Sequence, residues 1–213
     1  MSFTPSPQQA EAIRAIVDWF QNRTADQQVF RLFGYAGSGK STVINYAIQA
    51  LGISTASPEE ATEGGRVMFG AFTGKAALVM TRKGTPASTI HSMIYRVSEA
   101  TPDEIARVEK ELHDLRQGLG QMEAAERSFA ELQIRKLQLR LADIHKPTFV
   151  LNDQSLVRDT DLVVLDEVSM VGPEMAADLL AFGKPILVLG DPGQLPPIKG
   201  TGAFTEAVPD IML

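Results

Sequence analysis

The chain has 213 residues, of which 44% are hydrophobic and 22% are charged, so it can form a packed core and is not disordered throughout. It contains no cysteine, which excludes a disulfide scaffold, a thiolate metal site and cysteine catalysis. Its formal net charge of −6 excludes a nucleic-acid binder with a basic surface throughout, but leaves room for a local basic groove. No apolar run is long enough to span a bilayer and the N-terminus lacks a secretory pattern, so we expect a soluble, cytoplasmic protein without a membrane partner.

The first third of the chain alternates between helical and extended patterns. Apolar residues recur at helical spacing in three segments, and Pro7 suits the first turn of the earliest one. The predicted helices span residues 7–21, 41–51 and 75–82. Short apolar runs predict strands over residues 29–33 and 67–72. Residues 52–65 are rich in small, polar and turn-forming types, which predicts a loop.

Residues 102–144 have a different pattern of apolar and charged residues. Apolar residues fall at 3-4-3 spacing from Ile105 to Leu115, with charged residues between them. Gly118 and Gly120 interrupt that pattern, and a second apolar, charge-laced stretch follows over residues 122–141. Because antiparallel helices need only a short turn between them, this segment predicts a helical hairpin. A short β-hairpin over residues 149–156 stays open.

Two short runs in the last third, residues 162–165 and 186–189, consist of valine, isoleucine and leucine. Such runs are typical of strands that are buried on both faces of a parallel sheet. The first run ends in an acidic pair and the second in Gly-Asp. The chain therefore predicts an α/β fold, in which a mainly parallel sheet is flanked by helices and carries an inserted helical hairpin.

The strongest motif lies between the strand and the helix predicted on either side of it. Residues 34–42 read Gly-Tyr-Ala-Gly-Ser-Gly-Lys-Ser-Thr and fit G-x-x-x-x-G-K-S/T. Glycines let successive N–H groups curl around phosphate oxygens, and the following helix adds its positive end. The predicted nucleotide-binding residues are Gly34, Ala36, Gly37, Ser38, Gly39, Lys40, Ser41 and Thr42. The alternative without a role in nucleotide binding is a glycine-rich turn with an incidental lysine.

The same chemistry needs a divalent metal ion and a group that activates water. Lys40 is expected to reach the β and γ phosphates of ATP as a catalytic group, and Ser41 to help hold Mg²⁺. Asp166 is a second predicted Mg²⁺ ligand, and Glu167 is the predicted catalytic base for the attacking water. Without the phosphate loop, this carboxylate pair would more simply mark the end of a strand.

Several motifs in order resemble the first RecA-like domain of superfamily 1 DNA helicases, in particular the RecD/Dda-like branch. Beside the phosphate loop, the motifs are Gln9-Ala-Glu-Ala-Ile13, Phe72-Thr-Gly-Lys-Ala-Ala77, Ser88-Thr-Ile-His-Ser92, Asp166-Glu-Val-Ser-Met170 and Gly190-Asp-Pro-Gly-Gln-Leu-Pro-Pro197. The last two are the most specific. The resemblance implies a P-loop NTPase that hydrolyses ATP with Mg²⁺, moves 5′ to 3′ along single-stranded DNA and unwinds duplex DNA in repair or recombination.

The resemblance also assigns residues. It implies that Gln9 recognises adenine and that Gln194 senses the γ-phosphate as a third catalytic residue. Contacts to single-stranded DNA, or to a junction between single and double strands, are implied for Thr73, Lys75, His91 and Ser92. The bland alternatives are a solvated side chain for Gln9, a helix cap for Thr73 and a packing or capping role for His91. Phe72 and Tyr95 either stack on bases or, more simply, pack in the core.

The expected organisation is a RecA-like domain of residues 1–96 and 158–213, interrupted by an accessory region of residues 97–157. Related helicases insert a strand-separating β-hairpin at this place, whereas this chain predicts helices. A solvated arm or a surface for a protein partner is therefore as good an interpretation as strand separation. The resemblance also implies a second RecA-like domain with an arginine finger, so we expect an N-terminal portion that hydrolyses ATP weakly or not at all by itself.

Two other classes of function remain open. One is a module that binds ATP and a partner or DNA without turnover. The other is a P-loop phosphotransferase unrelated to DNA, which would need an acceptor site and a lid. Stimulation of hydrolysis by a small phosphoryl acceptor, and not by DNA, would favour the second class.

Overall fold

The computed structural model describes residues 4–54, 66–144, 146–194 and 202–213. The chain forms two compact units, residues 1–94 with 152–213, and residues 95–151. The accessory region was expected over residues 97–157. Most of the expected loop 52–65, and the final three residues of the motif that ends at Pro197, lie outside the described residues.

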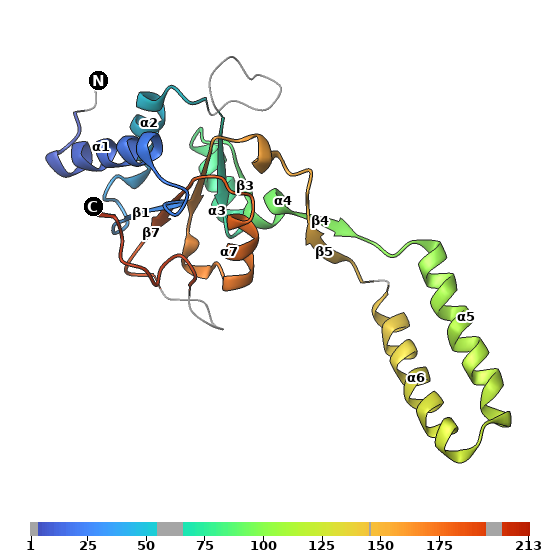
Figure 1. The fold of residues 1–213 in the computed structure, drawn as a ribbon. Coiled ribbons are helices and arrows are strands. Elements are labelled where there is room, and N and C mark those ends of the chain that lie inside the picture. Colours follow the sequence, from blue (N-terminus) through green and yellow to red (C-terminus); the bar gives the residue numbers. More distant parts are fainter. Residues whose placement is uncertain (1–3, 55–65, 145, 195–201) are drawn as a thin grey trace. The chain divides into compact units, whose positions relative to one another are not determined.

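The first unit is built on a parallel sheet with the strand order β3-β2-β6-β7-β1-β8 among the described residues (Figure 1). Its strands are β1 (Val29–Phe33), β2 (Val67–Ala71), β3 (Ala87–Thr89), β6 (Leu162–Asp166), β7 (Ile186–Gly190) and β8 (Ile211–Met212). Helices flank this sheet, so the α/β fold class predicted from the sequence is confirmed. The strands predicted over residues 29–33, 67–72, 162–165 and 186–189 are β1, β2, β6 and β7.

The helices of this unit are α1 (Pro7–Asn22), α2 (Lys40–Leu51), α3 (Gly74–Arg82), α4 (Ile90–Ile94) and α7 (Pro173–Leu180). Side chains cap two of them, α1 and α3. Ser6 and Gln9 form a reciprocal capping box at the start of α1, and Thr73 caps α3 by accepting from the Ala76 N–H. The predicted helices 7–21, 41–51 and 75–82 are therefore confirmed to within one residue at each end. The sequence analysis predicted neither α4 nor α7.

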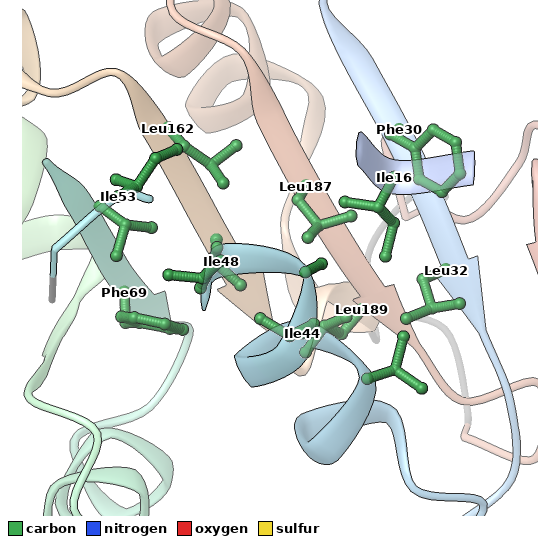
Figure 2. Close-up of a cluster of buried hydrophobic side chains, with 14 of the residues drawn as sticks. Ile16, Phe30, Leu32, Ile44, Ile48, Ile53, Phe69, Leu162, Leu187 and Leu189 are labelled. Atoms are coloured by element: carbon green, nitrogen blue, oxygen red, sulfur yellow. The ribbon is translucent and has the colours of Figure 1, made fainter. Parts of the chain in front are cut away.

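The core of the first unit lies between the sheet and the pair α1 and α2. Figure 2 shows Ile16 of α1 and Ile44 of α2 beside Leu187 and Leu189 of β7. These side chains are at most 2% exposed. Every residue from Leu162 to Leu165 is also buried, because both faces of this central strand are covered. This packing fixes the carboxyl ends of β1 and β6, from which the candidate site projects.

The second unit is a helical hairpin on a two-stranded base. Its helices are α5 (Pro102–Gly118) and α6 (Ala124–Asp143), and a 3₁₀ turn over Leu119–Gln121 follows α5 (Figure 1). The predicted hairpin is therefore confirmed. A small core around Val108, Leu112 and Leu137 holds the two helices together.

The possible β-hairpin over residues 149–156 is wrong. Strand β5 (Thr148–Leu151) instead pairs in antiparallel fashion with β4 (Tyr95–Ser98), which the sequence analysis did not predict. The two strands are the segments by which the chain enters and leaves this unit, so each finds its partner across the hairpin rather than next to it in sequence. The hydroxyl of Ser155 caps the following 3₁₀ turn over Leu156–Asp159, and this turn ends the extended segment. In the part of the chain that the structure describes, no helix is long and apolar enough to cross a membrane.

Candidate nucleotide-binding site

The glycine-rich loop joins the carboxyl end of β1 to the first turn of α2. Gly37 and Gly39 have φ angles of 84° and 92°, which L-residues with side chains rarely adopt. At Gly34, an added Cβ would lie 2.6 Å from the Ser38 Oγ, so this position is restricted by space instead. Gly39 caps α2 without a side-chain hydrogen bond, so side chains do not cap the N–H groups of its first turn. The loop therefore presents backbone donors at a helix N-terminus, which is an arrangement that binds phosphate.

Lys40 lies folded across this loop. Its Nζ donates to the carbonyl oxygens of Gly34, at 2.5 Å, and Tyr35, at 3.1 Å. Within the described residues, the Ser38 Oγ is buried and has no hydrogen-bond partner. A cationic side chain and a buried polar group thus lie in the loop that the motif assigns to nucleotide phosphates.

The acidic pair lies at the end of β6. Asp166 is the last residue of the strand, and its Oδ1 accepts from the Glu167 N–H at 2.9 Å. Glu167 has a φ of 54°, a left-handed conformation that non-glycine residues adopt mainly where the surroundings enforce it. The chain therefore turns sharply right after the strand, and two successive carboxylates stay at the same edge of the sheet.

One cavity of about 500 Å³ brings the two motifs together. Ser41 and Thr42 of α2 line it, and so do Asp166 and Glu167. Ser41 and Asp166 supply the hydroxyl and carboxylate oxygens that Mg²⁺ prefers, and this ion usually completes its coordination with water and substrate phosphates. The residues present therefore fit a magnesium–nucleotide complex.

Lys75 also lines this cavity, and it influences Glu167 electrostatically. Burial raises the pKa of the Glu167 carboxyl above its ordinary value, and the neighbouring Asp166 carboxylate raises it further. The Lys75 ammonium lowers the same pKa and so opposes both effects. A carboxylate with a raised pKa is a stronger proton acceptor, which is what a general base requires.

Gln9 contacts the phosphate loop, which the sequence analysis did not predict. Its Oε1 accepts from the Ser6 N–H at 3.0 Å, and its Nε2 donates to the Ser38 carbonyl at 3.3 Å. A Cβ on Gly39 would lie 2.5 Å from the same Nε2, so only glycine fits beside it without displacement. Gln9 is therefore half-buried and hydrogen-bonded to the loop, and adenine recognition stays a prediction.

Gln194 is linked to the acidic motif by a hydrogen bond. The Ser169 Oγ, which belongs to a buried residue two positions after Glu167, donates to the Gln194 Oε1 at 3.0 Å. The turn before Gln194 is held by the Gly193 N–H, which donates to the Asp191 Oδ1 at 2.9 Å. Gln194 does not line the cavity described above. Its connection to the site runs instead through Ser169.

The predicted DNA-contacting residues fall into two pairs. Thr73 and Lys75 line the cavity, and Thr73 also acts as the helix cap that was its bland alternative. His91 and Ser92 lie on α4 and are exposed. The His91 ring meets Phe72 edge-on, with 6.4 Å between ring centroids, and the Ser92 Oγ donates to the Thr89 carbonyl at 2.9 Å. The structure therefore brings the first pair, but not the second, to the carboxylates.

Comparison with protein families gives a match over nearly the whole chain. A family model described as an AAA domain matches residues 4–211, so the chain belongs to this family. No curated protein matches the chain. Family membership together with the phosphate loop indicates an ATP-binding nucleotide hydrolase of the P-loop type.

Proposed function

We propose that this member of the AAA-domain family is the first motor domain of a superfamily 1 DNA helicase of the RecD/Dda-like branch. It hydrolyses ATP to move along single-stranded DNA in the 5′ to 3′ direction and to unwind duplex DNA. One observation carries the proposal: Thr73 and Lys75, for which the resemblance implies DNA contacts, line the same cavity as Ser41, Asp166 and Glu167. The turn for which we propose DNA contacts and the candidate ATP site thus line one cavity.

The residues of the phosphate loop bind and orient the nucleotide. Backbone N–H groups from Gly37 to Lys40 surround the phosphates, and Lys40 exchanges its bonds to the loop carbonyls for bonds to the β and γ phosphates. Ser41 and Asp166 would hold Mg²⁺. When bound, this ion neutralises charge that develops on the phosphoryl oxygens.

Glu167 orients the water that attacks the γ-phosphate in line and accepts its proton. The raised pKa of the Glu167 carboxyl suits it to this role. Lys75 is the residue through which DNA changes the rate of hydrolysis. When a DNA phosphate attracts the Lys75 ammonium, the electrostatic effect of this lysine on Glu167 decreases. The pKa of Glu167 then rises and the carboxylate becomes a stronger base. Gln194 follows the state of the phosphate through its bond to Ser169.

A hydrolysis assay tests this proposal. We expect a single-stranded oligonucleotide to increase the low rate of ATP hydrolysis that the chain supports by itself. We expect Lys40→Ala to lower the rate by about 10²-fold or more with and without DNA, because a donor to the phosphates is lost. Lys110→Ala, which removes an exposed lysine of α5, is the matched control and should behave like the wild type. A rate that responds to a small phosphoryl acceptor but not to DNA would contradict the proposal and favour a phosphotransferase.

A further inference from the structure

Helix α6 carries apolar residues on two opposite faces. Ala130 and Leu137 are buried on the inner side, where they face the hairpin core. Phe129, Leu132 and Leu139 lie on the other side, with 65%, 51% and 62% of their surface exposed. At about 100° per residue, these three positions fall within roughly 80° of arc on the helix surface. We call Phe129, Leu132, Lys136 and Leu139 the outer stripe of α6.

The outer stripe has the spacing of a coiled-coil seam. Its four positions are separated by three, four and three residues, which is the a-d-a-d pattern of a heptad repeat. Lys136 is the polar residue at one a position, and such residues fix register and partner choice in coiled coils. The pattern of exposure therefore indicates a face built for a further helix, and not apolar residues scattered over a surface.

Two of the positions that flank this stripe carry arginine, whereas Ser128 and Gln133 are uncharged and Glu126 is acidic. In the heptad set by Phe129, Arg135 takes a g position and Arg140 an e position, and both are exposed. Arg140 also lines a cavity of about 490 Å³ with Glu104 and Asp143, so Arg135 and the stripe residue Lys136 supply most of the unbalanced charge. This local charge is positive although the chain as a whole carries −6.

A second copy of the chain suits this face less well than an acidic helix does. In a parallel pair, heptad geometry places Arg135 opposite Arg140 of the other copy and Lys136 opposite its own counterpart. In the antiparallel alignment that matches the apolar layers, Arg135 lies opposite its own counterpart, although Glu126 lies opposite Arg140. Each arrangement leaves at least one pair of like charges face to face, whereas an acidic helix meets Arg135 and Arg140 with the opposite charge.

We propose that the outer stripe of α6 binds an amphipathic helix of a partner protein, with apolar residues at its a and d positions and glutamate or aspartate at its e and g positions. The partner helix lies along α6 on the side opposite α5. Its acidic flanks pair with Arg135 and Arg140, and its apolar residues cover Phe129, Leu132 and Leu139. Two of these three side chains are leucines, which offer no aromatic surface for base stacking, so a protein helix suits the face better than single-stranded DNA.

A pair of synthetic peptides of about four heptads tests this proposal with the full chain. Both carry leucine at a and d; one has glutamate at e and g, and the other has lysine. We expect fluorescence anisotropy to show that the chain binds the glutamate peptide at least about tenfold more tightly. The double substitution Leu132→Ser and Leu139→Ser should weaken this binding about tenfold or more, whereas Leu156→Ser, at a matched exposed leucine of the first unit, should not change it.

Charge reversal makes the test specific. The double substitution Arg135→Glu and Lys136→Glu should reverse the preference, so that the lysine peptide binds more tightly. Because these side chains are exposed, circular dichroism should show unchanged helix content in each variant. Equal affinity for the two peptides, or no effect of the leucine substitutions, would overturn the proposal. So would leucine substitutions that abolish dimerisation in sedimentation experiments, or that abolish oligonucleotide binding while peptide binding is retained.

Discussion

The nucleotide site and the outer stripe of α6 use apolar residues in opposite ways. At the site, the apolar run Leu162–Leu165 is wholly buried, and its burial holds Asp166 and Glu167 at the edge of the sheet. On α6, apolar residues such as Leu139 are exposed and lie outside the small core between the two helices. The comparison teaches that the proposed chemistry depends on residues held by the buried core, whereas the proposed partner recognition depends on a face that the fold does not need. Substitutions should therefore separate the two regions by what they damage.

The largest expected effect is on chemistry alone. Glu167→Gln removes the proton acceptor while keeping the size of the side chain, so we expect a loss of about 10²–10⁴-fold in the hydrolysis rate. Nucleotide binding should persist, because the phosphate loop is untouched. Single-turnover hydrolysis and equilibrium titration with a labelled nucleotide measure the two properties separately. A variant that hydrolyses ATP as fast as the wild type would show that another group is the base.

Two side-chain truncations, one in the core of the first unit and one on the outer stripe of α6, compare how much each region contributes to stability. Ile44→Ala removes a side chain that is 2% exposed in the core, and we expect it to lower the free energy of unfolding by about 2–5 kcal/mol. Leu139→Ala on the outer stripe of α6 should change it by no more than about 0.5 kcal/mol. Urea denaturation followed by circular dichroism compares the two variants. Similar losses would mean that the outer stripe is part of the folding core.

The bond between Ser169 and Gln194 should have a moderate effect. Ser169→Ala removes the donor and leaves the Gln194 Oε1 without it, so we expect a loss of about 1 kcal/mol in stability. If the bond transmits the state of the phosphate, DNA stimulation of hydrolysis should fall as well. Ser169→Thr keeps the hydroxyl and should restore the stimulation more than the stability. If Ser169→Ala kept the full DNA stimulation of hydrolysis, the bond would have no role in the mechanism.

The smallest expected effect is a displacement of the pH profile. Glu167 must be ionised to accept a proton, so activity falls as the pH drops through its pKa. Because burial and Asp166 raise that pKa, the acidic limb of the pH–rate profile should lie at a higher pH than it would for an ordinary glutamate. Lys75→Met removes the cation that lowers the pKa, so the limb should move to still higher pH. The measurement is the rate of ATP hydrolysis at a series of acidic pH values, without DNA, for the wild type and for Lys75→Met. An acidic limb of the variant that lay at the same or a lower pH than that of the wild type would contradict the account.

Local patterns in the sequence predicted the elements that carry the site. The apolar runs of β6 and β7 are unambiguous because both faces of these strands are buried, whereas β1 leaves Val29 and Arg31 partly exposed. The start of α1 is equally clear, since Ser6, Pro7 and Gln9 together form its cap. Strands β4 and β5 were harder to predict, because they are short, partly exposed and separated by the whole helical hairpin.

The contacts within the site were less predictable than its residues. The motif placed Lys40, Asp166 and Glu167 in the nucleotide site, and the structure brings Asp166 and Glu167 into one cavity with Ser41. The sequence did not predict the contact of Gln9 with the Ser38 carbonyl or that of Ser169 with Gln194. Both depend on how separate segments meet in three dimensions, and no local spacing encodes that meeting. The roles of His91 and Ser92 in DNA binding stay predictions.

The central claim is that the DNA-contacting turn and the ATP site act through one cavity. The most direct test compares DNA stimulation of ATP hydrolysis in the wild type, in Lys75→Met and in the control Lys110→Met. We expect stimulation in the wild type and in the control, and its loss in Lys75→Met, because the lysine that faces Glu167 is removed. Equal stimulation of all three proteins would contradict the account.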